Sequence, residues 1–248
     1  MKTCLALVVF LVFCKSPGAV AGPPLSIDDP GVLDPGRWEI IGATTLTSGS
    51  QGDYWQAPLL DVSLGVIEDH VQIGFVYPYA HADSGDEGLQ SDFGNAEIGV
   101  KWRFYKTERL QMALAPYHAF GVSTRTAGKG VGDENDATVV PINGEYRVTD
   151  RLSLNGEIRY IRVDSQENAW GYGAALAFSA NDRWTWLIEV AGETDTDFDD
   201  EFIELRAGFD AALSDSIHLL FSIATGIQEP SGAGELDYDI FLGLQVFP

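Results

Sequence analysis

Cysteine is nearly absent from this sequence. The 248 residues contain only two cysteines, Cys4 and Cys14, and both lie in a stretch, residues 1–21, that has the form of a secretory signal peptide. Lys2 supplies its positive charge, residues 5–13 form a short apolar core, and a small-x-small cleavage site ends it. The exported chain is therefore expected to have no disulfide, no thiolate nucleophile and no cysteine metal site.

Long apolar runs and basic residues are also scarce. After Ala21 no apolar stretch approaches the ~20 residues that a transmembrane helix needs, so the chain can span a membrane only as a closed β-barrel. The 15 lysines and arginines are outnumbered by 37 aspartates and glutamates, which gives a formal net charge of -22. Because phosphate binding needs a basic face, this balance excludes nucleic acid as a partner.

The sequence instead alternates apolar and polar residues over segments of ten or more residues. From residue 96 to 104, apolar side chains take the even positions, while Glu97, Lys101 and Arg103 take odd ones. A tilted strand of ~9–11 residues crosses a bilayer, and barrels of this kind have even strand counts. We predict twelve strands, at residues 37–47, 54–66, 71–82, 92–104, 109–124, 136–148, 151–163, 168–180, 183–194, 201–213, 216–227 and 236–247. The predicted fold class is all-β, a 12-stranded antiparallel up-and-down transmembrane β-barrel.

The connections between these strands alternate in length, as in outer-membrane barrels with short periplasmic turns and longer outer loops. Short polar turns are expected at residues 68–70, 106–108, 149–150, 181–182 and 214–215. Longer loops rich in glycine and acidic residues include 83–91, 125–135 and 229–235. We therefore predict a cleaved signal peptide over residues 1–21, an N-terminal periplasmic segment over residues 22–36, and an outer-membrane β-barrel over residues 37–248.

Aromatic and basic residues favour the same orientation. The tryptophans lie near predicted strand ends, at Trp38, Trp102, Trp184 and Trp186 by the short turns and at Trp55 and Trp170 by the long loops. Two such levels match the aromatic girdles of a membrane barrel. Basic residues gather by the short turns, at Arg37, Lys101, Arg103, Lys106, Arg109, Arg147, Arg151 and Arg183. A soluble barrel, with its apolar face inward, would not place tryptophans at both rims.

The N-terminal third resembles a known family. The segments that carry the resemblance are 24–30 (PLSIDDP), 35–39 (PGRWE), 58–61 (PLLD), the 65–72 hairpin and 99–104 (GVKWRF). They are similar to the outer-membrane transporter-like barrels named after the meta-pathway of phenol degradation, over about residues 24–104. The resemblance implies an outer-membrane barrel that moves small organic molecules, and it supplies no catalytic residues.

Charged residues collect on the strand faces that would not meet lipid. Three strands carry a glutamate and an arginine two residues apart, and hence on one face. The candidate lumen-lining residues are Asp61, Glu97, Lys101, Arg103, Glu145, Arg147, Glu157, Arg159, Glu189, Glu204, Arg206, Asp210 and Asp239. Such side chains tune selectivity in pores, but they could equally form salt bridges that fill a small barrel. The sequence leaves open both a water-filled passage and a packed interior.

The predicted function is porin-like passage or uptake of small organic solutes, aromatic ones included, through a polar, mixed-charge lumen. The expected partners are outer-membrane lipid, lipopolysaccharide and small organic solutes, and the protein is expected to be a monomer without a cofactor. One alternative is a structural or surface-interaction barrel with a closed lumen. The other is an outer-membrane lipid hydrolase, which would need serine, histidine and an acid to converge near the bilayer edge.

Neither an enzyme nor a metal site is predicted. His118 and Ser123 lie five residues apart and so face opposite sides of a strand, and His81 and Ser84 have no clear residue to orient the imidazole. The acidic residues of 195–199 have the spacing of a calcium loop, but the required glycine and closing glutamate are missing.

Overall fold

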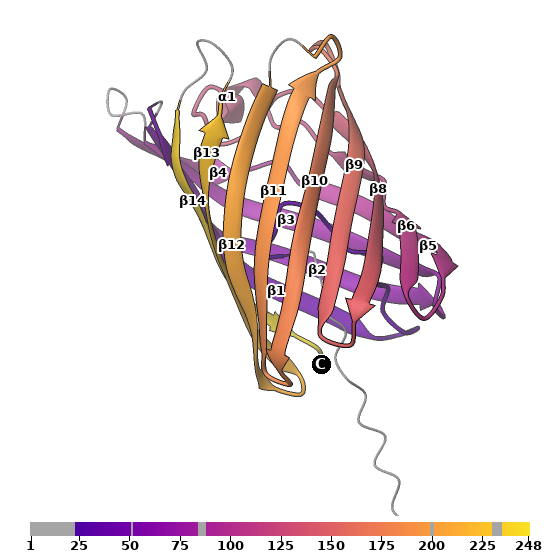
Figure 1. Ribbon diagram of the computed structural model, residues 1–248. Helices are drawn as coiled ribbons and strands as arrows, with labels where there is room; N and C mark the ends of the chain where they lie inside the picture. The colour runs from indigo at the N-terminus through magenta and orange to yellow at the C-terminus, as the bar shows by residue number, and fades with distance from the viewer. Residues whose placement is uncertain (1–22, 51, 84–87, 199–200, 230–234) are drawn as a thin grey trace, which may run out of the picture.

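The computed structural model describes residues 23–50, 52–83, 88–198, 201–229 and 235–248. The predicted signal peptide lies outside these residues. The strands close into an antiparallel barrel, because the first strand pairs with the last (Figure 1). They are β1 (Trp38–Gly49), β2 (Gly52–Ile67), β3 (Val71–Asp83), β4 (Leu89–Phe93), β5 (Glu97–Lys106), β6 (Leu110–Leu114), β7 (Tyr117–Ala119), β8 (Ala137–Thr149), β9 (Leu152–Val163), β10 (Ala169–Asn181), β11 (Trp184–Asp195), β12 (Glu201–Ser214), β13 (Ile217–Gln228) and β14 (Leu236–Val246).

These strands occupy twelve positions around the barrel, which confirms the predicted fold class. β4 and β5 pair with successive parts of β3 and together form one position. β6 and β7 likewise share one position between β5 and β8. The predicted strands at 92–104 and 109–124 are thus each interrupted. Pro116, which has no backbone N–H to give to a ladder, follows the end of β6.

The predicted strand at 109–124 also ends earlier than expected. Regular pairing stops at Ala119, and a short helix, α1 (Thr124–Ala127), follows within the connection to β8. The Ser123 side chain accepts a hydrogen bond from the Thr126 backbone N–H and caps this helix. Asn95 fastens the same connection, because its side-chain N–H donates to the carbonyl oxygens of Phe120 and Asp133. Apolar alternation alone did not reveal this change to turn chemistry.

The outer face of the barrel is apolar. On β11 the exposed residues are Trp186, Ile188 and Val190, whereas Leu187 and Glu189 between them are buried. This arrangement reverses that of a soluble protein, in which a large exposed apolar surface is rare. A closed barrel with this outer surface is an outer-membrane protein. No helix in the described part of the chain is long and apolar enough to cross a membrane.

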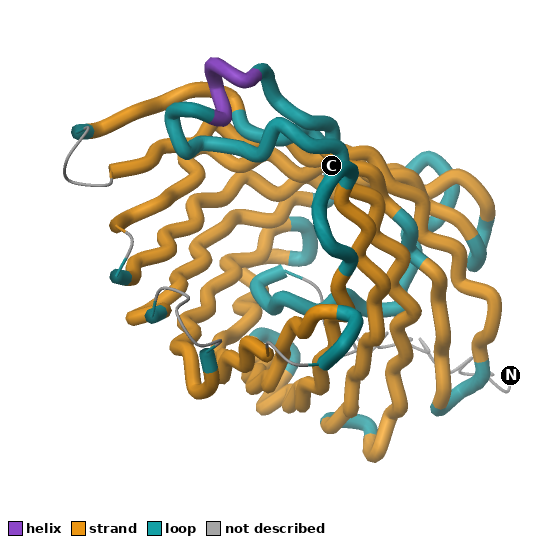
Figure 2. Tube along the Cα trace, turned by 90° about the horizontal axis from the view of Figure 1, so that it is seen from above, coloured by secondary structure: helices purple, strands orange, loops and turns teal. Residues whose placement is uncertain are grey.

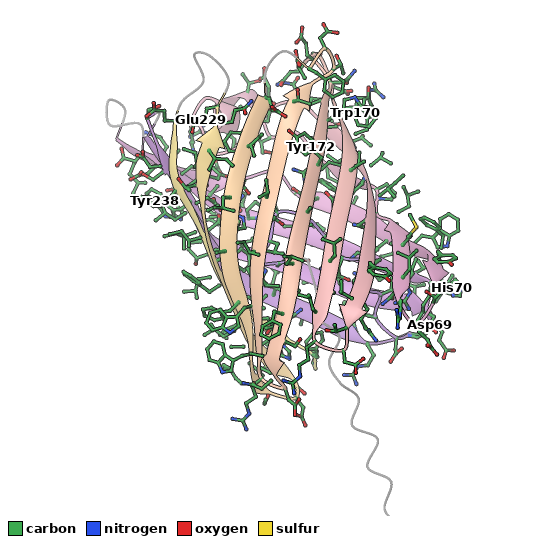
Figure 3. The ribbon with its side chains drawn as sticks, in the orientation of Figure 1. Asp69, His70, Trp170, Tyr172, Glu229 and Tyr238 are labelled. Atoms are coloured by element: carbon green, nitrogen blue, oxygen red, sulfur yellow. The ribbon has the colours of Figure 1, made fainter. Side chains whose placement is uncertain are left out.

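Aromatic rings lie at both ends of the outer face. Trp184 and Trp186 stack with ring centroids 5.8 Å apart beside the short turns. Tyr160 and Trp170 lie 5.0 Å apart near the long loops. Figure 3 shows Trp170 near the loop end of the barrel and Asp69 near the turn end. We call the end with the long loops the loop end and the end with the short turns the turn end.

The β2–β3 turn is held by two neighbouring cations. Asp69 has a φ of 60°, which aspartate tolerates better than most residues. Its carboxylate accepts hydrogen bonds from Lys106 at 2.5 Å and from Arg103 at 2.7 Å. Arg103 also donates to the Asp69 carbonyl oxygen at 3.0 Å. The hydrogen bond from Lys106, together with the charges of both cations, lowers the pKa of Asp69 below its usual value.

An Asp69→Asn variant is expected to be less heat-stable than the wild type by about 1 kcal/mol or less at neutral pH, because the Asp69 carboxylate and its partner Lys106 are half-exposed. The lowered pKa means that the stabilisation is present above the unfolded pKa of about 3.9 and is lost as pH falls through the folded value. The difference between the two proteins should therefore disappear in acid. Heat modifiability on unheated gels across pH measures it. Asp150→Asn, in a turn where Asp150 forms no ion pair with described residues, is the control, and an equal effect there would contradict the assignment.

The occluded lumen as the candidate functional site

The segment before β1 turns back into the barrel and crosses the lumen (Figures 1 and 2). The Pro24 carbonyl oxygen accepts a hydrogen bond of 2.6 Å from Ser222 on β13. On another part of the wall, the Leu33 backbone N–H donates to Gln72 on β3 at 3.1 Å. We call residues 23–34 the plug segment. The region predicted as an N-terminal periplasmic segment, residues 22–36, includes these contacts with the inner wall, and its assignment to the periplasm stays a prediction.

An apolar contact fixes the middle of the plug segment. Ile27 is 1% exposed and Leu25 is also buried. Both pack against a cluster of small and apolar wall residues, which are Ala175, Ala177, Leu187 and Ala191. Gly173 belongs to the same wall, and a Cβ built there would lie 2.4 Å from the Ile27 Cγ2 atom. The wall is therefore shaped around this isoleucine.

A buried carboxylate holds the plug segment beside that contact. Glu189, which is 1% exposed, accepts hydrogen bonds from the Ser26 backbone N–H at 3.0 Å, the Ser26 hydroxyl at 2.6 Å and the Ile27 backbone N–H at 3.1 Å. Glu157 on β9 accepts a further bond of 3.0 Å from the Asp28 backbone N–H. Charge-assisted hydrogen bonds of this kind are about twice as strong as neutral ones. Two glutamates of the barrel wall thus bind the backbone of the plug segment.

Arginines balance part of this wall charge. Arg206 forms ion pairs with Glu204 at 3.0 Å and Asp239 at 2.8 Å, and its Nε lies 3.7 Å from Glu189. Arg159 contacts Glu157 at 3.0 Å and Glu193 at 2.8 Å. Two of the three glutamate–arginine pairs noted in the sequence are therefore ion pairs.

The third pair, Glu145 and Arg147, forms no ion pair in the described part of the chain. Glu145 is buried on β8, and it lies opposite Asn155 in the β8–β9 register. Two buried side-chain oxygens nearby, those of Asn143 and Asn155, have no protein partner among the described atoms. This part of the wall is polar and buried, and some of its hydrogen-bond acceptors have no donor among the described atoms.

The remaining candidates lie on the turn-end side of the plug segment. Asp61, Glu97 and Lys101 line a cavity of about 180 Å³ on the turn-end side, where Lys101 binds Asp28 at 2.8 Å. Asp210 pairs with His218 at 2.8 Å closer to the turns. Arg103 is buried and caps the β2–β3 turn through its hydrogen bonds to Asp69.

Open space continues on the loop-end side. A cavity of about 420 Å³ adjoins Ser26 of the plug segment. The wall residues around it include Arg159, Glu193, Phe202, Glu204, Arg206 and Asp239. A wider cavity of about 660 Å³ lies at the loop end, between the ends of β1–β3 and residues 127–130. The plug segment therefore lies between two polar cavities of one lumen.

Sequence reasoning missed the plug residues Ser26, Ile27 and Asp28, and also Ser222 on the wall. One signal was available for the plug. Leu25 and Ile27 are apolar residues in a segment that would have nowhere to bury them in the periplasm. Nothing in the local sequence, however, points to their partners on the far wall.

The histidines and serines considered for a hydrolase make other contacts in the described part of the chain. His118 contacts Thr138 at 3.0 Å and Asp136 at 3.5 Å, while Ser123 caps α1. His81 contacts the Ser91 hydroxyl at 2.8 Å. No group of three or more histidine or acidic side chains in the described part is placed to hold a metal ion. Ser84 and Asp199 lie outside the described residues.

No family model matches the chain, and no curated protein matches it in sequence. Solved structures do match its fold. The COG4313 outer membrane channel from Pseudomonas putida F1 superposes with a TM-score of 0.75 at 10% identity, over 90% of this chain and 100% of that one. The KdgM porin gives a TM-score of 0.61 at 10% identity, over 84% and 98% of the two chains. The NanC porin gives 0.60 at 11% identity, over 85% and 99%. These neighbours are channels rather than enzymes, and the chain shares the fold of outer-membrane porins.

Proposed function

We propose that this protein is a monomeric outer-membrane channel for small organic solutes, aromatic ones included, and that its plug segment closes the resting lumen. The observation that carries the proposal is the interrupted passage. Polar cavities of about 420 and 180 Å³ lie on either side of a segment that is not part of the barrel wall. Displacing that segment would join them without breaking the strand ladder.

The neighbours in fold support a solute channel. One of them is described as a monoaromatic hydrocarbon channel; it superposes with a TM-score of 0.50 at 9% identity, over 87% of this chain and 89% of that one. The KdgM porin was also solved in complex with disordered oligogalacturonate. We also propose that the chain belongs with the barrels named after the meta-pathway of phenol degradation, as its residues 24–104 suggest.

The wall charges would set which ions and solutes pass. Around the loop-end cavity, five carboxylates face two guanidinium groups; the acids are Glu157, Glu189, Glu193, Glu204 and Asp239. The turn-end cavity sets Asp28, Glu39, Asp61 and Glu97 against Lys101 alone. Rings of one sign favour counter-ions in a narrow pore. We therefore expect a cation-preferring lumen.

Arg206→Ala is expected to raise the permeability of potassium over chloride several-fold, because it leaves Glu204 and Asp239 without their cation. Reversal potentials in planar bilayers under a salt gradient measure this ratio. Arg151→Ala makes the same charge change at an exposed turn and should leave selectivity as in the wild type. Equal shifts in both variants, or none in either, would argue against conduction past Arg206.

The non-transporting barrel is the second candidate, and the buried plug segment is the observation that favours it. Liposome swelling separates the two functions. Swelling in the presence of small organic solutes, such as alcohols of about the size of phenol, supports the channel. Swelling no faster than that of protein-free liposomes supports the closed barrel. The acidic outer loops would meet lipopolysaccharide through bridging cations in either case.

A further inference from the structure

The plug segment presents an unusual set of groups to the wall. Over Ser26 to Asp28 its contacts with Glu189 and Glu157 are made by three backbone N–H groups and one hydroxyl, all of them donors. Directly beside these donors, the Ile27 side chain fills an apolar pocket. Hydrogen-bond donors next to an apolar group are also what a small organic ammonium ion carries.

We infer that residues 26–28 occupy the binding position of the permeating solute, and that this solute is an organic cation with an ammonium group beside an apolar body. The inference rests on the proposed function, in which the plug segment leaves the lumen. It goes further by naming the class of solute and the residues that select it, Glu189 for the ammonium group and the Ala175–Leu187–Ala191 surface for the apolar body.

Glu189 requires a replacement donor once the plug segment leaves. All three hydrogen bonds that it accepts within the described residues come from Ser26 and Ile27. Arg206 is the nearest cation, but its own bonds go to Glu204, Asp239 and Ser222. A buried carboxylate without donors is costly, so an arriving donor is favoured at this point.

The surrounding charge selects against an anion. Arg206 and Arg159 each keep two carboxylate partners once the plug segment leaves. Arg159 then loses a 3.3 Å hydrogen bond to the Ser26 carbonyl oxygen, and Lys101 loses Asp28 on the turn-end side. The carboxylates outnumber the arginines around the loop-end cavity. The local charge therefore strengthens the binding of a cation, leaves that of a neutral solute unchanged, and weakens that of an anion.

The loop-end cavity and the pocket that Ile27 fills are both consistent with a solute bound at residues 26–28. The loop-end cavity of about 420 Å³ touches Ser26, Ala191 and Phe202, so a solute entering from that side reaches the plug donors first. Its volume lies within the range of small-molecule sites. The pocket that Ile27 fills is lined by alanines and by Gly173, where a Cβ would clash with Ile27. A compact apolar group would take the place of the Ile27 side chain there.

Thiol labelling tests the inference in the full exported chain, which is expected to have no other cysteine. In Ile27→Cys the only thiol lies on the plug segment and should react with a maleimide only when that segment leaves the wall. The probes are 2-phenylethylamine, 2-phenylethanol and 3-phenylpropionate, which share an aromatic body and differ in charge. We expect the amine to speed labelling by about fivefold or more, in the range of ordinary coupling between ligands, and the other two to have little effect.

Two second-site variants locate the ammonium site. Glu189→Gln, added to Ile27→Cys, should abolish the acceleration by the amine, measured as the ratio of rates with and without it. Glu108→Gln, which removes an exposed acid from the turn between β5 and β6, should preserve that ratio. Equal acceleration by all three probes, acceleration by none of them, or an unchanged ratio in Glu189→Gln would overturn the inference. Denatured protein must label at the same rate in every case.

The proposed function fails separately from this inference. If Ile27→Asp, described below, does not raise conductance, then the plug segment is not the barrier and the channel proposal itself fails. If that variant conducts but the amine has no advantage over the alcohol, the channel stands and only the assigned solute class is wrong.

Discussion

Oxidising an Ile27→Cys/Gly173→Cys double variant is expected to abolish conductance through the barrel, and reduction is expected to restore it. A Cβ at Gly173 lies 2.4 Å from Ile27 Cγ2, so the two Cβ atoms are separated by about 4 Å or less, within the range of a disulfide. The bond would tie the plug segment to β10 and remove every state in which that segment leaves the wall.

The readout is single-channel current before and after addition of a reductant. The chain's two natural cysteines, Cys4 and Cys14, both belong to the predicted signal peptide, so no competing disulfide is expected. Each single cysteine variant serves as a control and should not respond to reductant. Persistent conduction by the oxidised protein, with the cross-link confirmed by mass spectrometry, would show that solutes bypass the plug segment.

The barrel itself follows from local pattern. Alternation along each strand separates a lipid face from an inward face, and on β11 the buried Glu189 lies between the exposed Ile188 and Val190. Because the side-chain period of a strand is two, one misplaced residue would exchange the faces. The membrane therefore fixes the register strongly, and twelve strands could be predicted from the sequence.

The plug segment could not be predicted in the same way. It has no strand or helix period, and its contacts are remote in the chain. Ser26 and Glu189 are 163 residues apart, and Pro24 and Ser222 are 198 apart. The sequence identified Glu189 and Glu157 as inward-facing, but it did not show that the segment before β1 would supply their hydrogen-bond donors. Pairing between a backbone N–H and a distant carboxylate depends on the closed barrel, not on nearby residues.

Replacing Ile27 by aspartate is expected to open the channel. The new carboxylate would lie in an apolar pocket beside the buried Glu189, where a second negative charge with no cation of its own costs several kcal/mol. Each ~1.4 kcal/mol lost by the plugged state raises the ratio of open to closed barrels about tenfold. The expected result is a large rise in open probability, with more cations than anions carried.

Three matched variants separate charge from packing. Ile27→Val removes one methyl group and costs about 1 kcal/mol, so the open-to-closed ratio should rise by less than tenfold. Ile27→Asn has the shape of aspartate without its charge and should lie between valine and aspartate. Because residue 27 is outside the strand ladder, all three barrels should keep wild-type heat modifiability on gels. An aspartate variant that folds like the wild type but conducts no better would mean that the plug segment does not control passage. The charged residues of the lumen would then only stabilise the barrel wall.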